Sequence, residues 1–135
     1  MSLQHNGQTC ILIAETDLPF LDEMKRALEQ AGHVVIVATD GMEAWNYLTH
    51  AAPPDLLVTR CYLRAGMPPG TALGLCAQTC KPRIPVVYIP ESAEAAEYAD
   101  PQHGAVLIKP FPVAKLVKTV RQIFEKVPGA ERPLR

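Results

Sequence analysis

The sequence predicts an α/β fold, an open, doubly wound sheet of parallel strands with helices on both faces. Five short apolar runs recur along the 135 residues: CILIA, VVIVA, LLVT, VVYI and AVLI, which begin at Cys10, Val34, Leu56, Val86 and Ala105. Because none of them alternates with polar residues, each is expected to be covered on both faces, as in the interior of a parallel sheet. Amphipathic stretches between the runs supply the helices.

Four helices are predicted from apolar residues spaced three and four positions apart. Asp17 is placed to cap the first, Gly32 follows its end, and the second and third come after Asp40 and Thr71. The apolar stripes are, in chain order, Leu21, Met24, Leu28 and Ala31; Ala44, Trp45, Leu48 and Ala52; Leu73, Cys76 and Cys80; and Val113, Leu116, Val117, Val120, Ile123, Phe124 and Val127.

One further segment, ESAEAAEY at residues 91–98, has good helix formers but little large apolar surface. A short or loosely packed helix is therefore expected there, and Pro101 must end it. Residues 1–135 are expected to form a single domain, with a core over about 9–127 and frayed ends.

Composition limits the function classes. The formal net charge is -1, so no overall basic field draws the chain to nucleic acid or to a membrane surface. The amino terminus lacks a secretory pattern and the apolar runs are too short to span a bilayer, which predicts a cytoplasmic protein. Its four cysteines, at positions 10, 61, 76 and 80, are then expected to be reduced core thiols.

Five blocks in order, ILIAETDLPFL, DGMEAWNYL, PPDLLVTR, IPVVYIP and LIKPF, resemble the receiver domain of two-component response regulators. The resemblance covers roughly Thr9 to Val127. It implies a flavodoxin-like sheet with strand order 2-1-3-4-5. It also implies a site at the carboxyl ends of the strands, where such sheets carry their chemistry.

In that family an acidic pair and an aspartate hold Mg²⁺, and the aspartate accepts a phosphoryl group from a histidine kinase. A hydroxyl residue and a lysine contact the phosphoryl oxygens, and an aromatic residue reports the change. In this sequence, Glu15 and Thr16 take the place of the acidic pair, with Asp17 beside them, and Arg60 takes the place of the acceptor aspartate. Pro90 replaces the hydroxyl residue, Val106 replaces the aromatic residue, and Lys109 matches the lysine. The resemblance also suggests that the peptide bond between Lys109 and Pro110 is cis.

The chemistry of Arg60 decides what these departures mean. A guanidinium has no lone pair to attack phosphorus, so Arg60 cannot form an acyl phosphate. Its fixed positive charge also opposes a divalent cation, so we expect no catalytic residues, no Mg²⁺ and no other cofactor. We hypothesise that Arg60 bridges to Glu15 or Asp17 where the metal would lie; the alternative is an arginine that extends to solvent without a fixed partner.

Other features have less specific readings. An anion could lie between Arg60 and Lys109. Asp55 begins the third strand and is interpreted as a surface turn residue. Cys76 and Cys80, with Cys61 nearby, could ligate a metal but lack the further ligands of a zinc site, which favours thiols packed in the core. The stretch RAGMPPG at residues 64–70 is interpreted as a surface insertion or a contact loop.

The sequence therefore predicts a non-enzymatic, degenerate receiver that acts as a protein interaction module in bacterial signal transduction. Its partner would be a histidine kinase, an output domain or another regulator. A homodimer through the last two helices and the fifth strand is a further expectation, as is either a stand-alone regulator or a fragment of a larger protein. Two alternatives remain: phosphorylation at a non-standard residue, and an anion or small-ligand sensor that uses Arg60 and Lys109.

Overall fold

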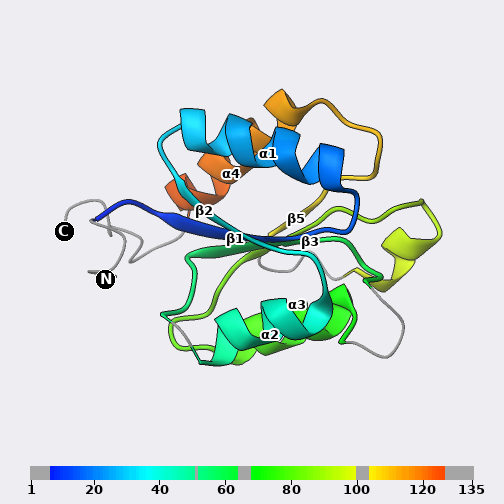
Figure 1. The fold of residues 1–135 in the computed structure, drawn as a ribbon, viewed down its shortest axis with the longest axis horizontal. Helices are drawn as coiled ribbons and strands as arrows, with labels where there is room; N and C mark the ends of the chain where they lie inside the picture. Colours follow the sequence, from blue (N-terminus) through cyan, green and yellow to red (C-terminus); the bar gives the residue numbers. More distant parts are fainter. Residues whose placement is uncertain (1–6, 51, 64–67, 100–103, 127–135) are drawn as a thin grey trace.

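A computed structural model describes residues 7–50, 52–63, 68–99 and 104–126. Strands and helices alternate along the chain (Figure 1). The elements are β1 (Cys10–Ala14), α1 (Leu18–Gln30), β2 (Val34–Ala38), α2 (Gly41–Thr49), β3 (Leu56–Thr59), α3 (Gly70–Thr79), β4 (Val86–Tyr88), the 3-10 helix η2 (Ala95–Tyr98), β5 (Ala105–Val106) and α4 (Val113–Lys126).

The five strands form one parallel sheet in the order β2-β1-β3-β4-β5, which confirms the predicted fold class and strand order. Every residue of the two central strands, β1 and β3, is buried, as their continuous apolar runs predict. Because the strands are parallel, all five carboxyl ends lie at the same edge of the sheet.

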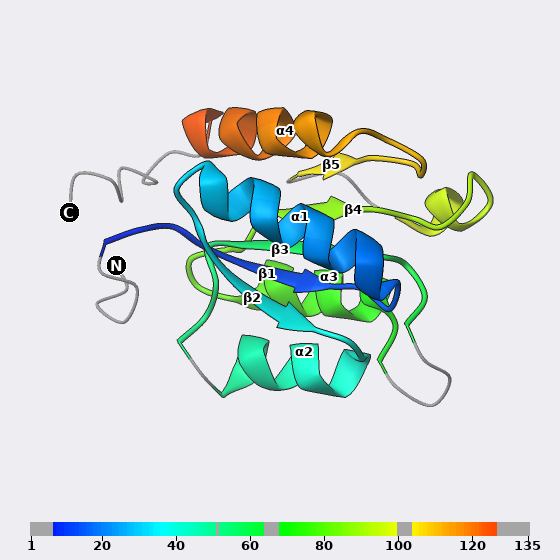
Figure 2. The ribbon, with the colours of Figure 1, turned by 45° about the horizontal axis from the view of Figure 1, so that its top comes forward.

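Two helical layers enclose this sheet. Figures 1 and 2 show α1 and α4 on one face and α2 and α3 on the other. Alternate residues of β1 divide between the two cores: Ile11 and Ile13 pack toward α1 and α4, whereas Leu12 and Ala14 pack toward α2 and α3. The side-chain period of two along a strand is the reason for this division.

The predicted caps hold at the starts of α1 and α2. The Asp17 carboxylate accepts a hydrogen bond from Phe20 N at 3.3 Å, and Asp40 accepts one from Glu43 N at 2.8 Å. Gly32 has φ +101°, a left-handed conformation that favours glycine just after a helix. Ala31 and Ala52, by contrast, fall outside the helices to which the stripes assigned them.

The third helix packs differently from its predicted stripe. Leu73, Gly74 and Ala77 are its buried face, whereas Cys76 is half-buried and Cys80 follows the end of the helix. A Cβ on Gly74 would lie 1.8 Å from the Tyr88 hydroxyl, so the tyrosine ring of β4 occupies the space that a larger helical residue would need. The stripe was misplaced by one position because a glycine lies at the closest approach of helix and sheet.

Segment 91–98 contains only one short helix, η2, in which Ala95 is buried, and this confirms the expected short, loosely packed element. Backbone hydrogen bonds extend the sheet one residue beyond several strands: Glu15 N donates to Ala38 O, Arg60 N to Ala14 O and Ile89 N to Thr59 O. These bonds hold Glu15 and Arg60 in register at the carboxyl edge of the sheet.

No helix in the described ranges is long and apolar enough to cross a bilayer. The expected frayed ends, Val127 of the last apolar stripe, Pro101 and residues 64–67 of the loop at 64–70 lie outside the described residues. The prediction of a single domain over residues 1–135 stays a prediction.

Candidate functional site

Glu15 is the centre of a charged network at the carboxyl edge of the sheet. Its side chain is completely buried at the end of β1. One carboxylate oxygen, Oε1, accepts a hydrogen bond from Lys109 Nζ at 2.7 Å. The other, Oε2, accepts bonds from Arg60 Nη1 at 3.1 Å and from the backbone amides of Thr16 at 2.8 Å and Asp17 at 2.9 Å. A buried carboxylate is therefore fully hydrogen-bonded.

Arg60 extends from the end of β3 toward the loop after β1. Its Nη1 also donates to Thr16 Oγ1 at 2.6 Å, and its side chain is only 20% exposed. The hypothesis that Arg60 bridges to an acid after β1 is confirmed for Glu15, and the alternative of a solvent-directed arginine without a fixed partner is wrong. Asp17, the other acid considered, instead caps α1.

Lys109 approaches Glu15 from the segment after β5. Its ammonium lies 5.0 Å from the centre of the Phe20 ring, a cation–π arrangement. Phe20 in turn meets Phe111 edge to face, with 5.3 Å between ring centroids. The Phe20 ring thus lies beside the Lys109–Glu15 ion pair, and the lysine side chain is only 18% exposed. The Lys109–Pro110 peptide bond is cis, as the resemblance suggests.

Glu91 is the member of the network that sequence reasoning missed. Its Oε2 lies 3.7 Å from Arg60 Nη2, and its side chain is 22% exposed. Glu91 lies three residues after the end of β4, and β4 is the neighbour of β3 in the sheet. An acid placed just beyond one strand and a cation just beyond the adjacent strand was the signal that could have identified the pair.

Two sequence-predicted positions contribute packing and backbone contacts. Pro90 is buried, and its carbonyl accepts a hydrogen bond from Lys109 N at 3.4 Å. Val106 is half-buried and packs against the core beneath α2 and α3. A pyrrolidine ring and a valine lack the hydroxyl and the aromatic ring that the receiver family uses at these positions.

The donor set does not fit Mg²⁺, which the receiver fold implies. Mg²⁺ prefers near-octahedral oxygen coordination that includes one or two carboxylates. Both oxygens of Glu15 are already committed to two cations and two amides, and a guanidinium nitrogen lies 3.1 Å from one of them. Among the described residues, no three His, Cys, Asp or Glu side chains converge on one point.

The cysteines have the properties of unreactive thiols. Burial raises the pKa of Cys61 to about 11, with a further increase from Glu91 and an opposing effect of Arg60. Burial also raises the pKa values of Cys76 and Cys80. All four cysteines are free, and Cys80 Sγ contacts the Cys76 carbonyl at 3.6 Å. Cys76 and Cys80 are half-buried and pack against the margin of the core beneath α2 and α3, so the predicted core thiols are only partly enclosed.

Asp55 also differs from its interpretation as a surface turn residue. It is half-buried, and its Oδ2 accepts a hydrogen bond from Cys10 N at 2.8 Å. Cys10 begins β1 and Asp55 immediately precedes β3, so the two meet at the amino edge of the sheet. This aspartate therefore connects two central strands at the end opposite Glu15.

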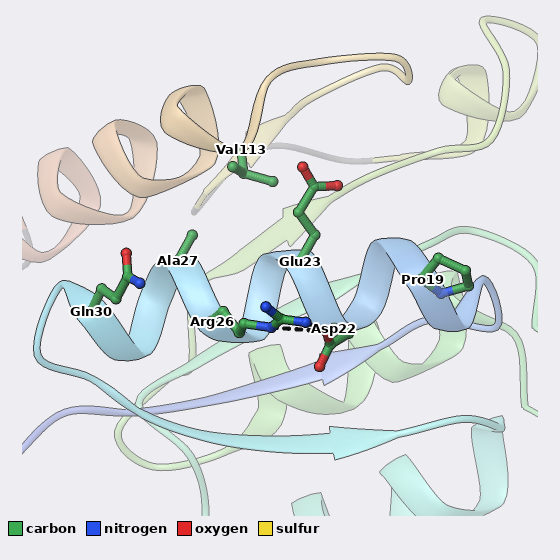
Figure 3. Close-up of a pocket in the computed structure, with 7 residues that line it drawn as sticks. All are labelled: Pro19, Asp22, Glu23, Arg26, Ala27, Gln30 and Val113. Atoms are coloured by element: carbon green, nitrogen blue, oxygen red, sulfur yellow. Dashed lines mark hydrogen bonds and ion pairs between the residues drawn. The ribbon is translucent and has the colours of Figure 1, made fainter.

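An open groove of about 450 Å³ lies between α1 and the start of α4, away from the Glu15 network. Figure 3 shows Glu23 directed toward Val113 across this groove, while Asp22 and Arg26 pair along α1. Asp22 and Arg26 are both exposed, and screening by solvent weakens such pairs. Among the described residues, the ion pairs of low exposure are those at the strand ends.

Solved structures that match this fold include receiver domains. A response regulator receiver protein from Sinorhizobium medicae WSM419 has a TM-score of 0.80 and 29% sequence identity, over 93% of this chain and 98% of that one. A CheY-like receiver domain protein from Methanospirillum hungatei JF-1 has a TM-score of 0.74 and 23% identity, over 93% and 98%. The receiver domain of NtrX from Brucella abortus has a TM-score of 0.71 and 22% identity, over 87% and 99%.

Sequence comparison alone is less informative. No protein-family model matches the chain, and no curated protein sequence matches it. The match with the Sinorhizobium medicae protein covers nearly the whole of both chains. The strand order in this structure agrees with the order that the resemblance implies. The chain has the fold of response regulator receiver domains, and this fold suggests a role in two-component signalling.

Proposed function

We propose that this chain is a receiver-fold signalling module that takes no phosphoryl group at the usual position and acts by binding other proteins. The observation that carries the proposal is the Arg60–Glu15–Lys109 network. Arg60 directly follows β3, at the position that by resemblance corresponds to a receiver's acceptor aspartate, and its guanidinium pairs with a fully buried carboxylate. A permanent cation cannot act as the nucleophile in phosphoryl transfer.

The same contacts argue against a second role for the site. An anion at this site would meet Glu15 and Glu91, the carboxylates with which Lys109 and Arg60 already form ion pairs. A bound anion would have to compete with carboxylates already in place, one of which is buried. We therefore propose that the network is structural, with no bound Mg²⁺, no other cofactor and no enzymatic activity.

Binding through the surface of η2, β5 and α4 is the form of interaction that we favour. Tyr98 is 65% exposed at the end of η2 and Ile108 is 45% exposed just after β5, so both present apolar area to solvent. Lys118 and Arg121 of α4 are exposed cations. The partner would be a histidine kinase, an output domain, another regulator or a second copy of this chain, in the cytoplasm.

One experiment tests the proposal directly. The protein is incubated with acetyl phosphate and Mg²⁺, and its intact mass and its molar mass in solution are measured before and after. Both are expected to stay unchanged, because no carboxylate occupies the acceptor position. The variant Arg60→Asp is the matched comparison, since it returns a carboxylate to the end of β3. A stable gain of one phosphoryl group by the unmodified chain would overturn the proposal.

A further inference from the structure

Arg60 is bonded unequally on its two sides. Toward β1, its Nη1 donates to Glu15 at 3.1 Å and to Thr16 at 2.6 Å. Toward β4, its Nη2 lies 3.7 Å from Glu91 Oε2, which is an ion-pair distance and too long for a hydrogen bond. The buried atoms Arg60 Nε and Glu91 Oε1 have no hydrogen-bond partner among the described residues. The Glu91 side is therefore the weakly bonded side.

The segment that follows Glu91 has few other attachments. Figures 1 and 2 show η2, the short yellow-green helix, beyond the carboxyl ends of the strands and apart from both helical layers. Its buried side chain is Ala95, whereas Glu94, Glu97 and Tyr98 are exposed. A four-residue 3-10 helix with one small apolar anchor belongs to the least stable part of a fold.

We propose that Arg60 and Glu91 form an electrostatic latch. When the pair is closed, it holds residues 91–98 against the strand ends, and when it opens, this segment moves while the Glu15 network stays intact. The inference rests on the proposed function in one respect: η2 belongs to the surface that we propose for binding. A partner that prefers the open segment would thus be coupled to Arg60 without any phosphoryl group, since it would shift a pre-existing equilibrium.

Glu91→Gln tests the latch, because it removes the charge and keeps the size of the side chain. The matched control is Glu94→Gln, which removes an exposed charge from the same segment. Hydrogen exchange is measured at the η2 amides of Ala96, Glu97 and Ala99, all of which donate within the segment. We expect exchange at these amides to be roughly threefold to tenfold faster in Glu91→Gln than in Glu94→Gln, as the loss of a partly buried ion pair implies.

Two further readouts separate a latch from general loosening. The Arg60 amide, which donates to Ala14 O, should exchange at the same rate in both variants, because neither substitution changes the contacts of Glu15 with Arg60 and Lys109. Added salt should accelerate η2 exchange in the unmodified chain relative to Glu91→Gln, since it screens the ion pair. Equal η2 exchange in the two variants, or equal acceleration throughout the sheet, would overturn the latch.

The outcome is independent of the phosphorylation experiment. If the unmodified chain gains a phosphoryl group and Glu91→Gln still accelerates η2 exchange, the proposed function fails and the latch stands. If the chain gains none and the two variants exchange alike, the proposed function stands and the latch fails.

Discussion

The two ends of the central strands use carboxylates in different ways. At the amino edge, the Asp55 carboxylate accepts a hydrogen bond from the Cys10 amide. Burial and the negative charge of Asp55 raise the pKa of the Cys10 thiol to about 12, so the thiol stays neutral. At the carboxyl edge, Glu15 is fully buried between Arg60 and Lys109. The amino edge therefore connects β1 to β3 with a hydrogen bond from a backbone amide to a carboxylate, whereas the carboxyl edge uses a buried carboxylate and two cations.

This difference indicates that the carboxyl edge carries charged contacts that the fold does not require for stability. Burying three charged groups costs desolvation energy, and a well-packed apolar cluster could often replace them without loss of stability. The charges lie at the edge where parallel α/β sheets carry their functional sites. The comparison therefore predicts that substitutions at the carboxyl edge will have large effects and those at the amino edge moderate ones.

The largest expected effect follows Glu15→Gln. The variant removes the negative charge shared by Arg60 and Lys109 and leaves two poorly hydrated cations near each other. Loss of one member of a buried network typically costs about 3–5 kcal/mol of unfolding free energy. Urea denaturation measures the loss. The control is Asp22→Asn, which breaks an exposed pair with Arg26 and should cost less than about 0.5 kcal/mol. Similar losses in both variants would contradict the contrast between surface and site.

A smaller effect is expected for Asp55→Ala at the amino edge. The variant leaves the Cys10 amide without its carboxylate acceptor, which should cost about 1–3 kcal/mol by the same denaturation measurement. Asp55→Asn keeps an acceptor oxygen and should lose less. If Asp55→Ala were as damaging as Glu15→Gln, the two edges would not differ as we describe.

The smallest effect concerns His33, also at the amino edge. Burial lowers the pKa of His33 below its usual 6.5, and Nδ1 contacts the Thr9 hydroxyl. The unfolded chain therefore takes up the proton at higher pH than the folded one does, so this contribution to stability is present above about pH 6.5 and is lost as the pH falls through the folded pKa. Unfolding midpoints measured across this range should show a decline that is weaker in His33→Gln. If the unfolding midpoint of His33→Gln declined equally with falling pH, the decline would arise from other titratable groups.

Much of the fold could be predicted from the sequence because its signals are local. The five apolar runs, the caps at Asp17 and Asp40, and Gly32 each act within a few residues. The misplaced stripe of α3 shows the limit. Gly74 faces the sheet because Tyr88, on a strand that follows the helix, fills the space beside it. No spacing rule within a helix contains that information.

The candidate site could be predicted in part for the same reason. The residue type at position 60 already excludes an acyl phosphate on that residue, and strand ends in a parallel sheet must meet. The sequence left two acids, Glu15 and Asp17, as possible partners of Arg60. In the structure, the Asp17 side chain accepts a hydrogen bond in the first turn of α1, whereas the Glu15 side chain accepts one from Arg60. Glu91 was not predicted as a partner of Arg60 because the pair depends on the distance between the segments that follow β3 and β4.

The sequence alone determined the fold class, the strand order implied by the resemblance and the presence of a cation directly after the third strand. Tertiary structure decided how that cation is neutralised. Glu15 reaches Arg60 across 45 positions and Lys109 across 94, and Glu91 joins from a fourth strand end, that of β4. Residue identity sets what a group can do chemically, whereas partners so distant in the chain are selected only when the sheet brings its strand ends together and excludes water from them.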